Sequence, residues 1–445
     1  MVKDSLHILV LTCHDLGRHL GCYGVGTVQT PHIDRLGAAG ARFERAFCTS
    51  PGCSPSRAAL ATGRYPHSNG VMGLTHPPFN WDLGPEERHI AQILGAAGYE
   101  THLFGHQHVS TRAGRLGFDT VHGPLPALGR DVAALLTRFL EAKAPDRPLY
   151  LEVNLEEPHR PYDQGGARPD RERGVSVPAY LPQDAASHEE MAALQGAIRQ
   201  ADGAVGAIVQ ALEGAGFSRN TLLVFTADHG LAMPRAKCTL YDPGIEIALI
   251  LRWPEGGVED GRVLHPMVSN VDLLPTLLQA AGVPAPPGLQ GRSLLPLLRG
   301  EPFVEREAAF AEKTYHSYYD PMRAIRTERF KYIRNFETAF EVEVPGDVQL
   351  GAIFREHVEL YHAGQHPPAE LYDLTEDPLE RHNLAGEGQL AEAQGRLDAA
   401  LWSWMAETGD PLLRGPVPSP AYVDTQRRLR QYVETTSLTD FQTSP

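Results

Sequence analysis

Short runs of hydrophobic residues bounded by polar ones recur along the first part of the chain. They cover residues 7–12, 101–104, 149–154, 221–226 and 247–252. An unbroken hydrophobic run of this length is typical of a strand that is buried on both faces of a parallel sheet. Stretches expected to be helical lie between them, at 86–97, 130–143, 189–213 and 271–282. This alternation predicts an α/β fold with a large, mostly parallel sheet sandwiched by helices.

The pattern changes after residues 283–291, a connector rich in proline and glycine. Hydrophobic and polar residues alternate over 324–336, as in a half-exposed antiparallel strand or hairpin, and a helix is expected near 388–406. We therefore predict a large N-terminal domain, a smaller C-terminal α+β subdomain and a weakly structured tail, at residues 1–300, 301–420 and 421–445. Residues 163–187 are polar and aperiodic, which favours a surface excursion or lid.

Charge and cysteine usage narrow the range of partners. The chain carries 40 Lys and Arg against 55 Asp and Glu, for a formal net charge of -15. This balance argues against nucleic acid or an anionic membrane as a partner, and an anionic substrate would need a local cationic pocket. The five cysteines include no CxxC pair, so neither a disulfide framework nor a zinc site is indicated. The N-terminal hydrophobic run is too short for a signal peptide, so we expect a cytoplasmic protein.

Residues able to do chemistry follow four of the predicted strands. In chain order these are Cys13 to Asp15, Gly105 to His108, Glu156 to Arg160, and Asp228 to Gly230. Ligands of open α/β sheets bind beyond the carboxyl ends of the strands, so this grouping predicts a functional site there. His14, Asp15, Asp228 and His229 would offer oxygen and nitrogen ligands to one divalent cation. The alternative interpretation is a set of helix caps and loop salt bridges.

The stretch CSPSRAALATG, residues 53–63, has the features of a short helix. Ser54 suits an N-cap, Pro55 suits the first helical position and Gly63 can end the helix. Cys53 would then lie just before a positive helix end, which favours an anion, and Arg57 adds a planar cation suited to a tetrahedral sulfonate or phosphonate group. These residues make Cys53 a candidate nucleophile, with a buried cysteine near a surface arginine as the simpler alternative.

This stretch also resembles the Cys-x-Pro-Ser-Arg signature of the type I sulfatases, which belong to the alkaline phosphatase superfamily. The resemblance extends to residues 7–17, 30–47, 225–230, 237–254, 268–284 and 370–385. Residues 63–74, 321–336 and 407–411 are most similar to the sulfamidase-like branch, that of N-sulfoglucosamine sulfohydrolase. The resemblance to the type I sulfatases implies that residues 1–300 form the catalytic domain of a metal-dependent hydrolase. This hydrolase would act on a sulfate ester or sulfamate of an anionic small molecule or glycan.

The resemblance also implies a role for each matching residue. Cys53 would be oxidised to formylglycine, the nucleophile, by a formylglycine-generating enzyme that is thus an expected partner. Arg57 would support the nucleophile, His108 would lie near it, and Lys237 would bind the sulfuryl oxygens and the leaving group. The metal ligands would be His14, Asp15, Cys53, Asp228 and His229. Ca²⁺ is the metal that the family implies, and whether the chain forms a homo-oligomer stays open.

The sequence departs from the family pattern at several of these positions. The usual Asp-Asp of the first loop is His14-Asp15, and His229 stands where most members have Asn. A neutral imidazole in place of a carboxylate removes a negative charge and softens the site, which favours Mn²⁺ or Mg²⁺ as alternatives to Ca²⁺. His106 replaces the lysine of Gly-Lys-x-His, and Glu156 replaces the first histidine of His-x-Pro-His, with His159 retained.

These departures leave several roles open. His106, His159 or Lys237 would protonate the leaving group. Glu156 would either form a structural ion pair with Arg160 or bind a cationic or hydroxyl-rich part of the substrate. In the second case Arg160 would also bind substrate. His316 lies in the sequence TYHSYYD and would bind a sugar ring or stabilise a subdomain interface. The alternative functions are a phosphonate monoester or phosphodiester hydrolase and a catalytically silent relative that binds a sulfated glycan.

Overall fold

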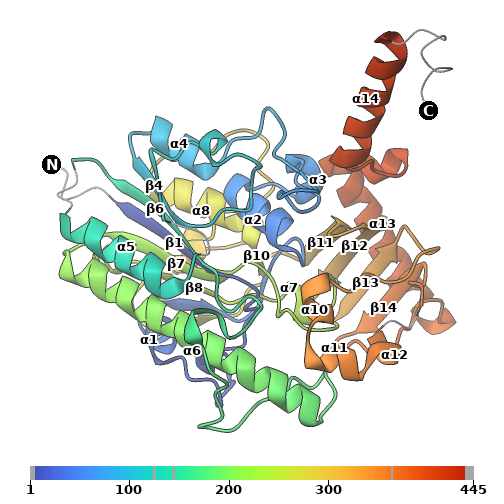
Figure 1. Cartoon of the computed structure of the whole chain (residues 1–445), viewed down its shortest axis with the longest axis horizontal. Helices are drawn as coiled ribbons and strands as arrows, with labels where there is room; N and C mark the ends of the chain where they lie inside the picture. Colours follow the sequence, from blue (N-terminus) through green and yellow to red (C-terminus); the bar gives the residue numbers. More distant parts are fainter. Residues whose placement is uncertain (1–5, 124–126, 143–145, 362–363, 436–445) are drawn as a thin grey trace, which may run out of the picture.

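An eight-stranded sheet forms the centre of the molecule (Figure 1). The computed structural model describes residues 6–123, 127–142, 146–361 and 364–435. The strands lie in the order β5-β4-β6-β1-β7-β8-β2-β9. Their bounds are β1 His7–Cys13, β2 Ala41–Phe43, β4 Glu100–Gly105, β5 Thr120–His122, β6 Leu149–Leu155, β7 Thr221–Ala227, β8 Leu249–Arg252 and β9 Arg262–Leu264. A two-stranded sheet pairs β3 (Ala46–Phe47) with β10 (Val268–Ser269).

The central sheet is mostly parallel, as the hydrophobic runs predict. β4, β6, β1 and β7 are parallel neighbours, and every residue of β1, β6 and β7 is buried. The fifth predicted strand, β8, instead runs antiparallel to β7. Only loops and the four-residue helix α7 (Asp242–Ile245) connect the two, so the chain turns back without a crossover helix on a face of the sheet.

Helices cover both faces of this sheet. Figure 1 shows α1 (Pro31–Ala38), α5 (Gly129–Ala142) and α6 (Ala185–Gly214) on one side, and α2 (Cys53–Thr62), α4 (Ile90–Ala96) and α8 (Leu273–Ala280) on the other. All four predicted helices are present with shifted ends. α4 begins later than predicted because the His89 side chain caps it, accepting from the backbone N–H of Ala91 at 3.2 Å. α6 begins earlier because Asp184 caps it.

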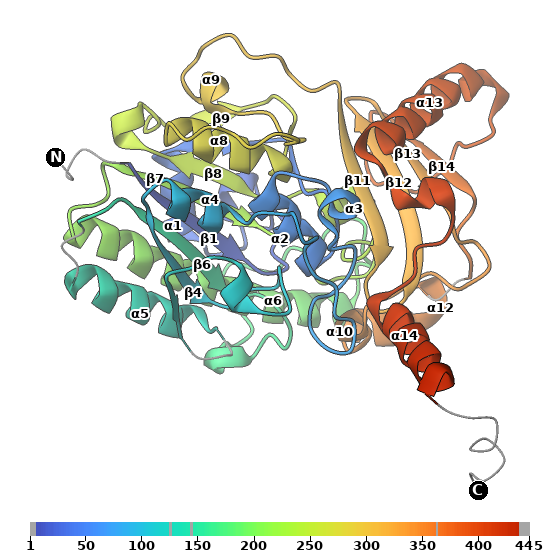
Figure 2. The same cartoon turned by 90° about the horizontal axis from the view of Figure 1, so that it is seen from above.

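The C-terminal region forms a second, antiparallel sheet with the order β11-β12-β13-β14 (Figure 2). Its strands are β11 Ala308–Tyr315, β12 Tyr319–Thr327, β13 Phe330–Asn335 and β14 Ala369–Asp373. β12 and β13 form the hairpin predicted over 324–336, and α13 (Ala391–Thr408) is the helix predicted near 388–406. The remaining short helices are α3 Pro66–Asn69, α9 Leu295–Leu298, α10 Gly346–Gln349, α11 Ala352–Glu356 and α12 Val358–Tyr361. The domain boundaries at 300 and 420 stay predictions.

Two segments expected to be irregular have different outcomes. Residues 163–184 do run irregularly, but they pack along α6, where the backbone N–H of Asp170 donates to the carbonyl of Ala192 at 2.8 Å. The expectation of a weakly structured tail is wrong up to residue 435, because α14 (Pro420–Thr435) is a helix that projects from the body (Figures 1 and 2). Residues 436–445 lie outside the described part.

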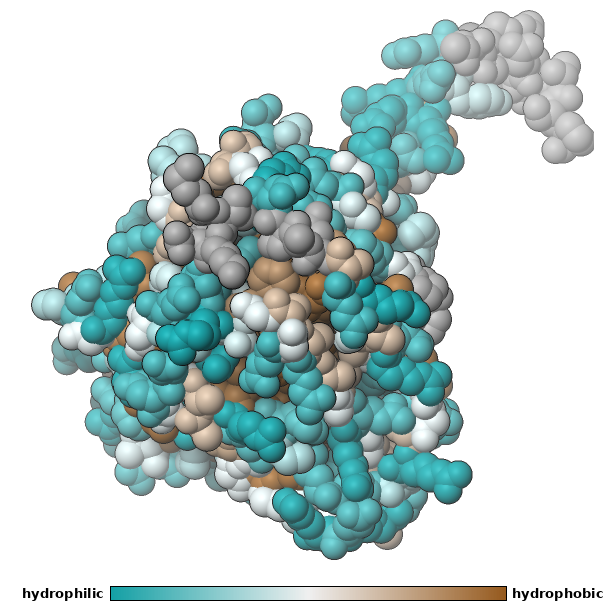
Figure 3. All heavy atoms as spheres, turned by 90° about the vertical axis from the view of Figure 1, so that its left-hand side faces the viewer, coloured by the Kyte–Doolittle hydropathy of each residue, from teal (hydrophilic) through white to brown (hydrophobic). Residues whose placement is uncertain are grey.

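The surface is mainly hydrophilic on the face drawn in Figure 3, where hydrophobic residues form small, separate areas. Among the described helices, none combines the length and hydrophobicity needed to cross a membrane.

Candidate active site

Helix α2 places Cys53 at its first position. Gly52 precedes it in an extended conformation, so the helix begins two residues earlier than predicted, and Ser54 and Pro55 lie inside the first turn instead of at the N-cap and first position. Proline is tolerated there because the first amides of a helix have no intrahelical partner. Gly63 ends the helix as predicted, with a positive φ of 65°. Cys53 is only 4% exposed and lies at the positive end of the helix dipole.

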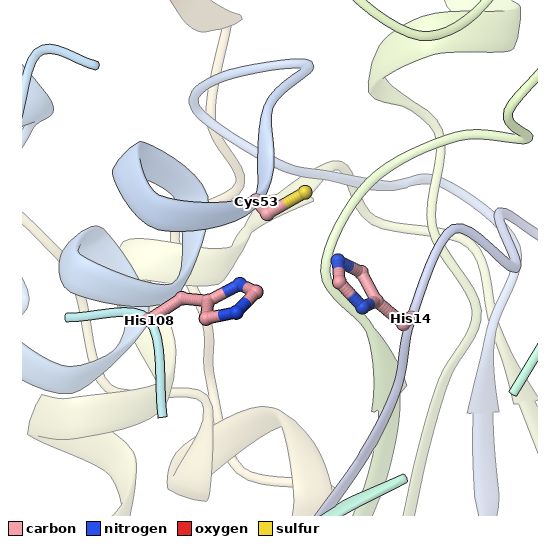
Figure 4. Close-up of side chains that lie close together, drawn as sticks. All are labelled: His14, Cys53 and His108. Atoms are coloured by element: carbon pink, nitrogen blue, oxygen red, sulfur yellow. The ribbon is translucent and has the colours of Figure 1, made fainter. Parts of the chain in front are cut away.

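The loops after four neighbouring strands meet at this helix end. β4, β6, β1 and β7 are adjacent and parallel, so their carboxyl ends lie at one edge of the sheet. The side chains of His14 and His108 point toward Cys53 (Figure 4). The structure therefore brings together the loops that the sequence singled out.

The buried part of this cluster fits a divalent cation. One ligand atom each from His14, Asp15, Cys53 and Asp228 lies within 4.8 Å of the others, and all four residues are buried. His229 Nε2 lies 3.0 Å from Asp15 Oδ1 and 3.3 Å from Cys53 Sγ. Neither ring nitrogen of His14 has a hydrogen-bond partner. Buried polar atoms without partners are costly, and a cation bound here would satisfy them.

Asp15 is held in place by backbone geometry and charge. Its φ of 54° is in the left-handed region, and its N–H donates to Asp228 Oδ1 at 2.9 Å. Burial by itself raises the pKa of Asp15, but the ammonium of Lys237 and the neighbouring histidines outweigh burial and hold that pKa well below its usual range. Asp15 is therefore ionised at neutral pH.

Arg57 links helix α2 to the ends of strands β6 and β7 through hydrogen bonds. Its Nε donates to Asp228 Oδ2 at 3.0 Å, and its Nη1 donates to Asn154 Oδ1 at 2.8 Å. Nη2 has no partner although the atom is buried, so it remains able to bind an anion beside Cys53. Sequence reasoning missed Asn154, although an amide inside the hydrophobic run of β6 was a detectable signal.

Lys237 lies between the two halves of the molecule. Its Nζ donates to Asp15 Oδ2 and to Asp347 Oδ2, both at 2.8 Å. Asp347 belongs to α10, 110 residues further along the chain, and sequence reasoning missed it because no local pattern marks it. A carboxylate from α10, in the C-terminal region of the chain, therefore lies beside Lys237 in this cluster.

The histidine rings of the cluster lie close together in tilted arrangements. The ring of His14 lies 4.4 Å from that of His159 and 5.3 Å from that of His106, measured between centroids, and His106 lies 4.7 Å from His108. Burial, reinforced by Arg57, lowers the pKa of His108 to about 3 and that of His106 well below its usual value. These two imidazoles are therefore neutral near pH 7. Glu156 Oε2 lies 3.4 Å from His106 Nδ1, and burial raises the pKa of this glutamate.

Arg160 and His316 settle into defined surroundings. The guanidinium of Arg160 pairs with Glu190 of α6 and donates to the Ala232 carbonyl at 2.9 Å. Of the two alternatives for Glu156, the structural pairing with Arg160 is therefore wrong. His316 lies against the start of α2, where a Cβ added to Gly52 would be 3.6 Å from its ring, and its Nδ1 is 3.4 Å from Glu343.

Glu343 anchors the segment that carries Asp347. Its Oε1 accepts from the Ser317 N–H at 2.7 Å, and its Oε2 lies 3.1 Å from Nζ of Lys313, which also contacts Asp320 at 2.6 Å. Cys238 and His316 have ligand atoms close to Glu343, but the Lys313 ammonium already pairs with this carboxylate. The group is therefore an ion-pair cluster.

Replacing Glu343 by glutamine is expected to give a pH-dependent loss of stability. Burial raises the pKa of Glu343, but Lys313 outweighs burial, and the pKa falls from 4.5 to about 2. A lowered carboxyl pKa stabilises the fold above the unfolded pKa, and this contribution disappears as the pH falls toward the folded pKa. At neutral pH, Glu343→Gln should lower the free energy of unfolding by about 3 kcal/mol. Urea unfolding should show the difference shrinking between about pH 5 and about pH 2; a constant difference would contradict this assignment.

Comparisons with known proteins identify the family of the chain. The family model described as Sulfatase matches residues 7–283, and the model described as N-sulphoglucosamine sulphohydrolase, C-terminal matches residues 229–349. N-sulphoglucosamine sulphohydrolase from Homo sapiens is 30% identical over 92% of this chain and 91% of its own length. An ulvan-active sulfatase from Formosa agariphila is 29% identical over 90% of this chain and 80% of its own length.

Solved structures share the fold. A 2-O GAG sulfatase superposes with a TM-score of 0.73 at 23% identity, covering 94% of this chain and 95% of its own. The phosphonate monoester hydrolase of Agrobacterium radiobacter superposes with a TM-score of 0.69 at 21% identity, covering 91% and 96%. At these identities the likeness extends to the fold alone.

Proposed function

Because the chain belongs to the sulfatase family of sulfuric ester and sulfamate hydrolases, we propose that it is metal-dependent and uses a formylglycine derived from Cys53 as its nucleophile. One observation carries this proposal. Cys53 begins a buried helix beside His14, Asp15 and Asp228, with a guanidinium nitrogen of Arg57 left without a partner. A reactive group, a cation shell and an anion donor therefore meet at one point.

The donor set of this site suits a hard or borderline cation. His14, Asp15, Asp228 and His229 would hold it, and a bound cation would polarise a sulfuryl oxygen as a Lewis acid. Two imidazoles beside two carboxylates make the site less negative than an all-oxygen shell, so we include Mn²⁺ and Mg²⁺ beside Ca²⁺ as its metal.

The nucleophile requires maturation of Cys53 by a formylglycine-generating enzyme. A hydrated formylglycine would offer two hydroxyls: one attacks sulfur as the bond to the leaving group breaks, and loss of the proton of the other expels sulfate and restores the aldehyde. His108 points toward residue 53, so it is placed to accept that second proton.

The other residues bind the anion and supply a proton. Arg57 Nη2 and the Lys237 ammonium would bind the sulfuryl oxygens. His106, His159 or Lys237 would protonate the leaving alcohol or amine. His159 is the partly exposed one of these three, with 23% of its side chain reached by solvent, so it lies closest to where a leaving group departs.

A parallel assay tests this function against its rivals. Chain produced together with the formylglycine-generating enzyme is given an aryl sulfate, an aryl sulfamate and a phenyl phosphonate ester, with metal analysis of the same preparation. We expect kcat/KM for a sulfur ester to exceed that for the phosphonate by at least about tenfold, which is about 1.4 kcal/mol of transition-state binding, and one cation per chain. A preference for the phosphonate would identify the alternative hydrolase, since Arg57 Nη2 would bind either tetrahedral anion. Turnover of no ester would favour the catalytically silent relative.

A further inference from the structure

Solvent reaches part of the cluster around Cys53, including His108, which is partly exposed. The side chains of His159, Glu156 and Asp347 are 23%, 20% and 19% exposed. Those of Asp15 and Lys237 are at most 2% exposed. Solvent therefore reaches the cluster beside two carboxylates, while the cations of the site lie deeper.

Both carboxylates flank one imidazole. Glu156 Oε1 lies 4.0 Å from Nδ1 of His159, and Asp347 Oδ2 lies 3.9 Å from Nε2 of the same ring. They come from different parts of the chain, since Glu156 follows β6 and Asp347 lies in α10. We call these two residues the acidic rim.

The carboxylate of Glu156 remains able to accept a hydrogen bond. Its distances to the ring nitrogens of His106 and His159 are 3.4 and 4.0 Å, longer than a normal hydrogen bond. Asp347 Oδ2 accepts a hydrogen bond from Lys237 Nζ. The rim thus places two partly exposed carboxylates beside the cluster.

The deep end of the site has the opposite character. Arg57 Nη2 has no hydrogen-bond partner, although this residue is more than nine-tenths buried. This cationic donor suits an anionic ligand group next to Cys53. The site therefore binds negative charge at its base and disfavours it at its entrance.

We propose that the acidic rim of Glu156 and Asp347 selects the leaving group. It favours compounds with one sulfo group and an amino or hydroxyl donor nearby, and it rejects a second anionic group. This inference rests on the proposed sulfatase function and specifies its substrate class. An ammonium or hydroxyl would donate to the rim, whereas a carboxylate or second sulfate would meet like charge.

A matched series of esters tests this selection in the full-length, matured chain. The substrates are 3-(aminomethyl)phenyl, 3-(hydroxymethyl)phenyl and 3-carboxyphenyl sulfate, which differ in charge at one position. The variants are Glu156→Gln and Asp347→Asn, which remove charge but keep shape. The control is Asp131→Asn on α5, a half-exposed aspartate paired with Arg130. Comparing each variant with the unmodified chain on the same ester cancels differences in leaving-group reactivity.

The expected result is a change in the ratio of kcat/KM for the aminomethyl ester to that for the carboxy ester. Each rim variant should lower this ratio about tenfold, mainly through KM, and the control should leave it unchanged. In the unmodified chain the ratio should also fall as salt is added, a measurement that does not depend on any variant folding.

The outcomes separate this inference from the function on which it rests. Turnover of all three esters with a ratio that neither variant nor salt alters would overturn the acidic rim and leave the sulfatase function standing. Turnover of none of them, nor of the simple aryl sulfate, would overturn both.

Discussion

Serine in place of Cys53 is expected to stop catalysis after at most one sulfuryl transfer. Serine has a single hydroxyl, so a sulfate ester formed on it has no second hydroxyl to expel the sulfate, and its release would require water to attack a hindered ester. The rate of turnover should fall roughly a thousandfold or more. Intact-mass measurement after incubation with an aryl sulfate should show at most one added sulfo group per chain.

A matched control for this variant is Cys22→Ser. Cys22 is a partly exposed free cysteine outside the cluster, on the short 3-10 turn Gly21–Tyr23, and its substitution should leave turnover unchanged. Normal turnover by Cys53→Ser would show that residue 53 does not act through an aldehyde.

Asparagine at position 228 is expected to remove the response to metal. Asp228 Oδ1 accepts from the N–H groups of Asp15 and His229 at 2.9 Å, and its Oδ2 lies 3.0 Å from Arg57 Nε and 3.4 Å from His14 Nε2. Asp228→Asn removes the charge that both the cation and the buried Arg57 require. We expect kcat/KM to fall roughly a thousandfold and the free energy of unfolding to drop by about 3 kcal/mol.

The measurement is thermal unfolding with and without added Ca²⁺, Mn²⁺ or Mg²⁺. The unmodified chain should melt at a higher temperature with the cation that it binds, and the variant should not. Asp260→Asn, at an exposed aspartate paired with Arg262, should behave like the unmodified chain. A variant that retains one cation per chain and full activity would contradict the ligand assignment.

The hydrophobic pattern was sufficient to predict the strands of the central sheet because those strands are buried on both faces. It was not sufficient to predict the direction of β8, because a hydrophobic run looks the same in either direction and the connecting loops determine it. The helix α14 was missed although its hydrophobic residues, including Tyr422, Leu429 and Val433, recur at helical spacing. These side chains are exposed in the structure.

The candidate site was predicted where its residues follow parallel strands, since topology alone brings such residues together. Its longer-range contacts were not predictable. Asp347 reaches Lys237 from the C-terminal region, and Arg160 pairs with Glu190 of α6 instead of with its sequence neighbour Glu156. Such contacts depend on how α6 and α10 pack against the loops. This packing produces no local spacing pattern in the sequence.

Two departures from the family pattern are explained by their contact. His106 stands where the family has lysine and Glu156 where it has histidine, and the two side chains are 3.4 Å apart. In this chain the neutral imidazole of His106 lies beside the carboxylate of Glu156, at positions where the family pattern has a cationic lysine and a histidine. Without a lysine at position 106, Arg57 and Lys237 are the two residues to which the proposed function assigns the sulfuryl oxygens.

The central claim is that residue 53 works as an aldehyde at the tip of α2. Mass spectrometry of the peptide containing residue 53, from chain produced with the formylglycine-generating enzyme, tests it most directly. The account predicts loss of the thiol sulfur and an aldehyde at this position that reacts with a hydrazide. An intact thiol at residue 53 in a preparation that turns over sulfate esters would contradict it.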